Sequence, residues 1–123
     1  MNNASKAHIV VVEDDQLVRE SLCDCVESAG YSVEGFASAE EFLTSNPGPN
    51  TACMILDIQL PGETGLELQR RLCNAAGPPV VFVTANITDT NRESAAKLGA
   101  KGFLSKPVRC QDLLNAIRAA IPS

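Results

Sequence analysis

The stretch HIVVVEDD, His8–Asp15, joins a short β-branched apolar run to three consecutive acidic side chains. A run that is apolar throughout, rather than alternating, is typical of a strand buried on both faces of a parallel sheet. The apolar stripe that follows over Gln16–Ala29 recurs at helical spacing and stops at Gly30, so it predicts a helix directly after the strand. The three acids therefore stand in the turn between a buried strand and a helix.

The same strand-then-helix pattern recurs four more times along the chain. Capping-box spacings at Ser38–Glu41 and Thr64–Glu67 open two of the later helices, and the second of these helices is expected to run through Ala76. A weaker helix is expected from Asp89 to Leu98. The remaining strands are predicted at Tyr31–Phe36, Cys53–Leu56, Pro79–Val83 and Gly102–Leu104. The last helix is marked by the apolar residues Leu113, Leu114, Ile117, Ala120 and Ile121.

This alternation determines the expected fold class. Strands that alternate with helices predict a parallel sheet covered by helices on both faces, and right-handed crossovers leave few strand orders open. We therefore expect an α/β fold, a doubly wound (βα)5 sheet of five parallel strands in the flavodoxin-like order 2-1-3-4-5. A chain of 123 residues has the size of one domain, so a single domain over residues 1–123 is expected.

Composition excludes several classes of protein. The chain is 45% hydrophobic and 20% charged, which is ordinary for a globular domain and not for a disordered one. Its apolar runs are too short for a membrane span, and its first residues lack the pattern of a secretory signal, so a cytoplasmic location is expected. The net charge of −5 argues against nucleic-acid binding by this domain itself, since phosphate contacts need clustered Lys and Arg.

The five cysteines do not form a recognisable metal or redox motif. Their number is odd, none is spaced as C-x-x-C, and the chain has a single histidine, so no ordinary zinc site is visible. We therefore expect all of them to be reduced thiols that pack as small hydrophobic side chains. They are Cys23, Cys25, Cys53, Cys73 and Cys110.

Polar residues follow the predicted strands at the points where each strand ends. Asp57 follows the third strand, Thr84 the fourth, and Lys106 and Pro107 the fifth. In a doubly wound sheet, ligands bind beyond the carboxyl ends of the strands, so these residues should converge there with the acids after the first strand. Crowded carboxylates repel one another unless a cation lies among them, and a set of oxygen ligands suits Mg²⁺. A carboxylate can also attack phosphorus to give an aspartyl-phosphate, with a lysine and a hydroxyl stabilising the phosphoryl oxygens.

Four sequence motifs, spread over nearly the whole chain, are similar to those of a known protein family. They are VVEDD at Val11–Asp15, ILDIQLPGETG at Ile55–Gly65, VFVTAN at Val81–Asn86 and KLGAKGFLSKP at Lys97–Pro107. In this order, each with its predicted strand, they resemble the receiver domain of bacterial two-component response regulators. The stretch SAEEFL at Ser38–Leu43 is most similar to regulators of the nitrogen-fixation type, which pair a receiver with a helix-turn-helix output domain.

The resemblance implies a role for each site residue. Asp57 would accept the phosphoryl group, Thr84 would bind a phosphoryl oxygen, and Lys106 would pair with the phosphate. The Mg²⁺ cofactor would be held by Asp57, by Asp14, by the main-chain carbonyl of Gln59 and with help from Glu13. Thr84 and Phe103 would form the switch, and the Lys106–Pro107 peptide bond is expected to be cis. The domain would not be an enzyme in the usual sense, because it catalyses only its own phosphotransfer and dephosphorylation.

Two registers of the acidic pair remain open at this point. The pair of metal-site acids is either Glu13–Asp14 or Asp14–Asp15, and the first is favoured because the pair normally follows the apolar run at once. Asp15 would then stand at the entrance of the first helix, where a carboxylate suits the helix dipole. At the other end of the chain, Arg109 and Cys110 open the last helix without a good N-cap.

The resemblance also implies partners. A sensor histidine kinase would donate the phosphoryl group, and the surface formed by the fourth helix, fifth strand and fifth helix would change in response. That surface would control a C-terminal DNA-binding output domain absent from this chain, and thereby transcription. Phosphorylation-dependent homodimerisation is a further expectation.

Three rival interpretations fit the residues less well. A haloacid-dehalogenase-type phosphatase also uses an aspartyl-phosphate, but it needs a second aspartate two residues after the nucleophile, where this chain has Gln59. A flavodoxin-like FMN module needs a loop rich in Ser, Thr or Gly after the first strand, where this chain has three acids. A receiver that is no longer phosphorylated is disfavoured by the complete residue set.

Overall fold

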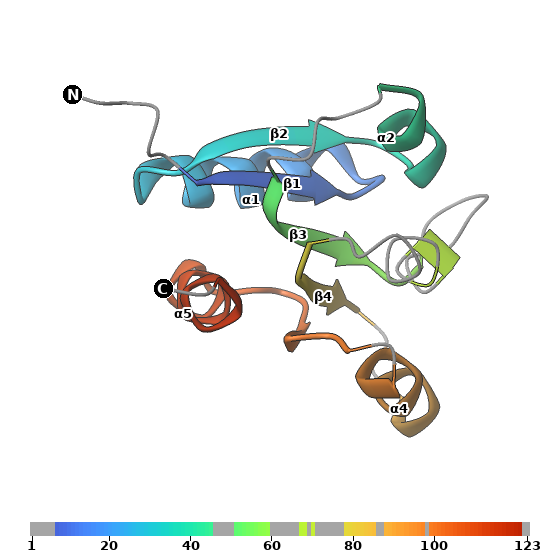
Figure 1. The fold of residues 1–123 in the computed structure, drawn as a ribbon. Helices are drawn as coiled ribbons and strands as arrows, with labels where there is room; N and C mark the ends of the chain where they lie inside the picture. The colour runs from blue at the N-terminus through green and yellow to red at the C-terminus, as the bar shows by residue number, and fades with distance from the viewer. Residues whose placement is uncertain are drawn as a thin grey trace.

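The structure is a computed structural model that describes residues 7–45, 51–59, 67–68, 70, 78–85, 88–97 and 99–121. Its five strands form one parallel sheet in the order β2-β1-β3-β4-β5, and helices alternate with the strands along the chain (Figure 1). The predicted doubly wound fold and its strand order are therefore confirmed.

The strands and helices lie close to their predicted positions. The strands are β1 (His8–Val12), β2 (Ser32–Phe36), β3 (Thr51–Asp57), β4 (Val80–Thr84) and β5 (Gly102–Ser105). The helices are α1 (Gln16–Ser28), α2 (Ala39–Ser45), α4 (Asp89–Lys97) and α5 (Cys110–Ala120). Within the described ranges, none of these helices combines the length and the hydrophobicity that crossing a bilayer requires.

Two boundaries differ from the prediction in a way that matters for the site. The third and fourth strands extend to include Asp57 and Thr84 as their last residues, so both side chains are fixed by strand hydrogen bonding rather than by a loop. Both residues are buried, at 4% and 0% exposure. The helix predicted over residues 64–76 lies largely outside the described residues, of which Glu67, Leu68 and Arg70 are helical.

The core forms a layer on each face of the sheet. On one face, Ile9, Val11 and the inner sides of α1 and α5 pack together, with Leu22 and Ile117 among the buried contacts. On the other face, side chains of β1, β3 and β4 pack against α2 and α4. The continuously apolar central strands are explained by this arrangement, because β1, β3 and β4 each have buried side chains on both faces.

Local signals in the sequence explain where the helices begin. Asp15 is the N-cap of α1, and its carboxylate accepts a hydrogen bond from the Val18 amide at 3.1 Å. Ser38 Oγ accepts from the Glu41 amide at 3.0 Å, as the capping-box spacing predicts. The helix α5 begins differently, because its N-cap residue, Arg109, makes no side-chain capping hydrogen bond.

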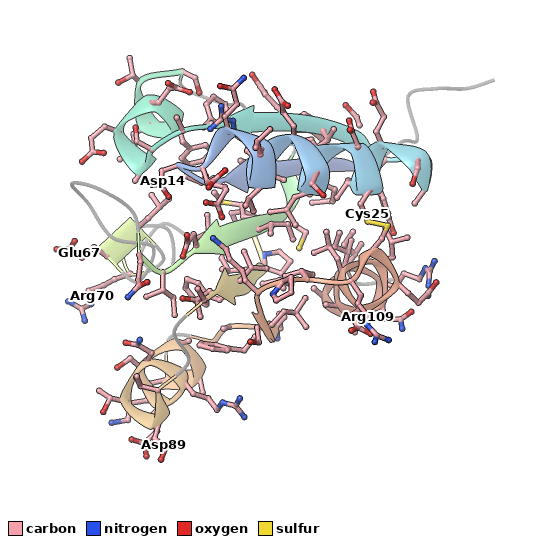
Figure 2. All side chains as sticks on the ribbon, turned by 180° about the vertical axis from the view of Figure 1, so that it is seen from behind. Asp14, Cys25, Glu67, Arg70, Asp89 and Arg109 are labelled. Atoms are coloured by element: carbon pink, nitrogen blue, oxygen red, sulfur yellow. A yellow bond between two sulfur atoms is a disulfide. The ribbon has the colours of Figure 1, made fainter. Side chains whose placement is uncertain are left out.

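The expectation that all five cysteines are reduced thiols is wrong for two of them. Cys25 of α1 and Cys110, the first residue of α5, are joined by a disulfide across 85 positions of sequence, with their Cα atoms 5.6 Å apart. Figure 2 shows the linked sulfurs beside the start of α5, where Arg109 is labelled. Sequence spacing could not indicate this pairing, because only the packing of α1 against α5 on the same face of the sheet brings the two thiols together.

The disulfide predicts a large difference between two cysteine variants. Under oxidising conditions, Cys110→Ser should lower the free energy of unfolding by about 2–4 kcal/mol, because it frees a long loop in the unfolded chain. Cys23→Ser is the matched control, since Cys23 is a free thiol on the same helix and its loss should cost at most about 1 kcal/mol. Urea denaturation of both variants and the parent measures this. Equal losses of stability in the two variants would contradict the link.

Candidate functional site

The predicted site residues meet at the carboxyl edge of the sheet. Val12 pairs with Leu56 across β1 and β3, so the next residues on each strand, Glu13 and Asp57, lie side by side. Thr84 ends the neighbouring strand β4 and pairs with Ser105, the residue before Lys106. Strand register alone therefore brings together residues that are far apart in the sequence.

Three acidic side chains form a compact cluster at this edge. Glu13, Asp14 and Asp57 each offer a carboxylate oxygen, and these oxygens all lie within 4.8 Å of one another. Glu13 and Asp57 are buried, whereas Asp14 is exposed. The cluster is thus half enclosed, with two acids buried at the edge of the sheet and one exposed to solvent.

One ammonium group lies among these acids. Lys106 Nζ donates a hydrogen bond to Asp57 Oδ2 at 2.9 Å and lies 2.6 Å from Glu13 Oε1. Burial raises the pKa of Glu13, and the nearby ammonium only partly opposes this effect. Burial by itself lowers the pKa of the Lys106 ammonium, but its contacts with Glu13 and Asp57 outweigh that effect and hold the pKa above its ordinary value. Lys106 is therefore held in its charged form between two acids.

Backbone amides fix the remaining carboxylate oxygens. The Asp15 amide donates to Glu13 Oε2 at 3.1 Å, and the Gln59 amide donates to Asp57 Oδ1 at 2.9 Å. Each buried acid thus has one oxygen held by the backbone and the other directed toward Lys106. This arrangement fixes the orientation of both carboxylates before any ligand arrives.

The cluster fits a hard divalent cation such as Mg²⁺. Glu13 Oε1 is fully buried and accepts no well-oriented hydrogen bond from any described residue, although the ammonium lies close to it. Glu13 Oε1 and the carboxylates of Asp14 and Asp57 together form a set of hard oxygen donors, which Mg²⁺ prefers. Asp15 is outside this cluster, because its carboxylate caps α1.

Arg19 is a supporting residue that the sequence did not indicate. Its Nη1 donates to the main-chain carbonyl of Glu13 at 2.8 Å, so α1 holds the turn that carries the acids. A Cβ at Gly35 would lie 3.2 Å from Arg19 Cγ and 3.1 Å from Cys23 Sγ, so the glycine in β2 makes room for the arginine stem. A lone arginine on a helix normally indicates a solvated face, and only the glycine inside a strand hinted at a close approach.

Thr84, Gln59 and Pro107 lie at or just beyond strand ends on the same edge of the sheet. Thr84 is fully buried, and its carbonyl accepts a hydrogen bond from the Lys106 amide at 2.9 Å. The Lys106–Pro107 peptide bond is cis. Gln59, two residues after Asp57, is exposed. All of the residues predicted from the strand ends therefore lie at this one edge.

Phe103 lies away from the carboxylates. Its ring packs against Phe82 with the ring centroids 6.2 Å apart, on the face of the sheet that α4 covers. The Arg92 guanidinium of α4 lies over the ring, 5.6 Å from its centroid. Phe103 is therefore half-buried between the sheet and α4 and is connected to the acidic cluster only through β4 and β5.

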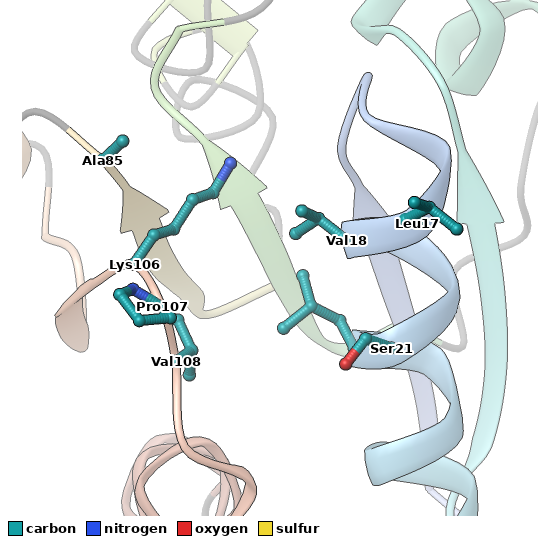
Figure 3. Close-up of a pocket in the computed structure, with 8 residues that line it drawn as sticks. Leu17, Val18, Ser21, Ala85, Lys106, Pro107 and Val108 are labelled. Carbon is teal, nitrogen blue, oxygen red and sulfur yellow. The ribbon is translucent and has the colours of Figure 1, made fainter.

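A groove of about 500 Å³ opens beside the site. One wall is α1, with Leu17, Val18 and Ser21, and the other is the segment of residues 106–108 (Figure 3). Leu17 is 77% exposed, the only large apolar side chain left open among the described residues. Lys106 lines the groove and extends from it toward β3, so the groove leads to Asp57.

The shared ammonium predicts a pH-dependent loss of stability in one variant. Lys106→Met should lower the free energy of unfolding at pH 7.5 by about 3–5 kcal/mol, because it leaves two buried carboxylates without their cation. The loss should shrink as the pH falls, since Glu13, whose pKa is raised, then takes up a proton and its charge disappears. Urea denaturation across pH, with the exposed Lys101→Met as control, tests this. A loss independent of pH would contradict the electrostatic cause.

Comparisons with known proteins agree with this geometry. The sequence pattern of one protein family, the response regulator receiver domain, matches residues 9–118. Nodulation protein W of Bradyrhizobium diazoefficiens is 42% identical over 118 residues, which cover 95% of this chain and 52% of that protein. The transcriptional regulatory protein FixJ of the same organism is 36% identical over 118 residues, covering 95% of this chain and 58% of that protein. The chain thus spans about half the length of the curated relatives it matches.

A solved structure shows the same fold. The response regulator receiver domain protein (CheY-like) from Methanospirillum hungatei superposes with a TM-score of 0.86 at 30% identity, covering 93% of this chain and 92% of that one. The resemblance to regulators of the nitrogen-fixation type is confirmed by the similarity to FixJ. By family match, relatives and fold, this chain belongs to the response regulator receiver domains, the phosphorylation-controlled switch modules of two-component signalling.

Proposed function

We propose that Asp57 accepts a phosphoryl group from a sensor histidine kinase and that this modification switches the domain. The observation that carries the proposal is the contact of 2.9 Å between Lys106 Nζ and Asp57 Oδ2 beside Glu13 and Asp14. A nucleophilic carboxylate needs both a cation to accompany the incoming phosphate and an anionic site for a metal, and these residues supply both.

The chain's own residues supply most of the chemistry. An Asp57 carboxylate oxygen attacks phosphorus, the bond from phosphorus to the donor histidine nitrogen breaks, and the histidine leaves. The Lys106 ammonium then follows the negative charge onto the new phosphoryl oxygens, and the Thr84 hydroxyl hydrogen-bonds one of them. Because Lys106 and Thr84 stand on adjoining strand ends, one movement toward the phosphoryl group serves both residues.

The proposed cofactor is Mg²⁺, and four residues would hold it. Asp14 and Asp57 would bind through their carboxylates and Gln59 through its main-chain carbonyl, with Glu13 assisting. When bound, the ion neutralises the carboxylates and the incoming phosphoryl oxygens. The domain is otherwise not an enzyme, since the only group it acts on is its own aspartate.

The response to phosphorylation would travel to the surface of α4, β5 and α5. Thr84 is paired to β5, the strand that carries Phe103, so a shift of Thr84 reaches the aromatic ring through one strand pair. Phe103 is held by Phe82 and Arg92, and it would be released or repacked when Thr84 moves. To change the ratio of active to inactive domain from about 1:99 to 99:1, phosphorylation must favour the active state by about 5.5 kcal/mol.

The groove beside Lys106 provides a docking surface for the kinase. A phosphohistidine is carried on a folded protein, so the donor must contact the receiver near Asp57. The exposed Leu17 and the wall of α1 offer an apolar contact surface at that position. Docking there would bring the donor to the open edge of the site.

The relatives support a role in transcription. FixJ is named as a transcriptional regulatory protein, and this chain covers 58% of its length. We infer that this receiver controls a DNA-binding output domain in the cytoplasm, with phosphorylation-dependent homodimerisation of the receiver as the intermediate step. The receiver, whose full sequence carries a net charge of −5, would not contact the DNA itself.

The phosphoacceptor is tested by mass spectrometry of the intact protein. Incubation with acetyl phosphate and Mg²⁺ should add one acid-labile phosphoryl group, and omission of Mg²⁺ should abolish the gain. Asp57→Asn should remain folded and gain nothing, because the amide is not a nucleophile. Asp24→Asn, an exposed acid on α1, is the control and should be modified like the parent. An Asp57→Asn variant that is phosphorylated to the same extent would overturn the assignment.

The metal ligands are tested by calorimetric titration with Mg²⁺. Asp14→Ala should weaken binding roughly tenfold or more, because it removes one of the few charged oxygens available to the ion. Asp15→Asn is the matched neighbour, since asparagine also caps helices and Mg²⁺ affinity should stay within about twofold. If Asp15→Asn weakens binding and Asp14→Ala does not, the acidic pair is assigned in the wrong register.

A further inference from the structure

The disulfide between Cys25 and Cys110 lies outside the site and plays no part in the proposed phosphotransfer. Its Cα separation of 5.6 Å falls within the usual range for disulfides, so the link can close without moving either helix. Figure 2 shows Cys25 and the labelled Asp14 at opposite ends of α1. The two cysteines therefore form a second, separate chemical feature of the same helix.

The other described cysteines are not comparable. Cys53 is fully buried in the sheet, and burial raises its pKa to about 12. Cys23 is a free, half-buried thiol whose pKa is also raised by burial. Cys110 is exposed at the start of α5, so a small molecule in solution can reach it. Among the described cysteines, the linked pair alone joins an exposed residue to a partner at bonding distance.

The link lies at one end of the groove described above. Cys25 is one helical turn beyond Ser21, which lines the wall formed by α1, and Cys110 is two residues beyond Val108 on the other wall. In Figure 3 the segment of residues 106–108 runs from Lys106 down to α5, opposite successive turns of α1. Lys106 reaches Asp57 from the other end of this segment, so the disulfide and the site share one short stretch of chain.

The start of α5 lacks a side-chain cap, although Leu113 packs in the core. Its N-cap residue, Arg109, makes no side-chain capping hydrogen bond, and the first amide hydrogen bond of the helix runs from Leu113 to the Arg109 carbonyl at 3.0 Å. An uncapped helix end frays readily. The covalent bond at Cys110 therefore holds a helix end that the local sequence leaves weak.

We propose that Cys25 and Cys110 form a reversible redox site that reacts with small disulfides of the glutathione class. The oxidised form fastens the first turn of α5 and residues 106–109 to α1, and the reduced form releases them. Part of this inference rests on the cytoplasmic location proposed above, because disulfides in a reducing compartment are characteristically transient and regulatory. The site is distinct from Asp57 and needs neither Mg²⁺ nor a phosphoryl donor.

The chemistry is two successive thiol–disulfide exchanges. The Cys110 thiolate attacks one sulfur of the small disulfide, forming a mixed disulfide and releasing one small thiolate. Cys25 Sγ then attacks Cys110 Sγ, the mixed disulfide breaks, and a second small thiolate leaves. Two electrons pass from the cysteine pair to the small disulfide, and the two protons lost by the cysteines end on the released thiols.

Reversibility is tested on the whole chain in glutathione buffers without Mg²⁺ or phosphodonor. Samples are denatured, alkylated and weighed as intact protein. Of the five cysteines, three should be alkylated in an oxidised buffer and all five in a buffer rich in reduced glutathione, with peptide mapping assigning the lost pair. Alkylation of all five in every buffer, or a link that reduced glutathione never opens, would overturn the proposal.

The structural consequence is tested by hydrogen exchange. Reduction of the parent protein should speed exchange of the Leu113 amide about tenfold, because the first turn of α5 loses its attachment. Cys25→Ser should exchange at the fast rate in both buffers, whereas Cys23→Ser should respond to reduction as the parent does. Equal exchange in the oxidised and reduced parent would overturn the link between redox state and α5. Neither readout depends on Asp57, so a failure here is separate from a failure of phosphorylation.

Discussion

Two buried carboxylates and one ammonium group share the carboxyl edge of this sheet, and the rest of the site depends on their charges. Glu13 and Asp57 would repel each other without Lys106, which contacts both. The contact is possible because the strand register brings the end of β3, with Asp57, to the same edge as the residues that follow β1 and β5, Glu13 and Lys106. A slip of one residue in any of these strands would turn the site side chains to the opposite face. The apolar strands therefore matter for the chemistry as well as for the core.

Much of this arrangement could be predicted from the sequence. Continuous apolar runs and helix signals predicted a parallel sheet, and right-handed crossovers left few strand orders, of which the one expected is observed. The same pattern predicted that Asp57, Thr84 and Lys106 would share one edge with the acids after the first strand, and the structure places them there. The position of Asp15 was left open by the sequence, and the helix cap that it forms accounts for its place outside the cluster.

The features that were missed depend on contacts between helices and loops. Arg19 supports the acidic turn through a main-chain carbonyl, and nothing in a lone helical arginine indicates such a partner. Cys25 and Cys110 are separated by most of the chain, and pairing of distant cysteines follows from helix packing rather than from spacing. Both features involve α1, whose sequence shows only an ordinary amphipathic helix. The first helix therefore holds the metal-site turn, forms a groove wall and carries one end of a covalent link.

That covalent link has a topological consequence. It closes a loop that runs from the last turn of the first helix to the start of the last one, and this loop contains β2 to β5 together with Asp57, Thr84 and Lys106. A cut in the backbone at any point inside the loop would leave the two resulting pieces joined through sulfur. Tension on the end of α5, as from an attached domain, would likewise pass through Cys110 into α1 and bypass the short strand β5. With the link closed, the domain is thus mechanically joined from its first helix to its last.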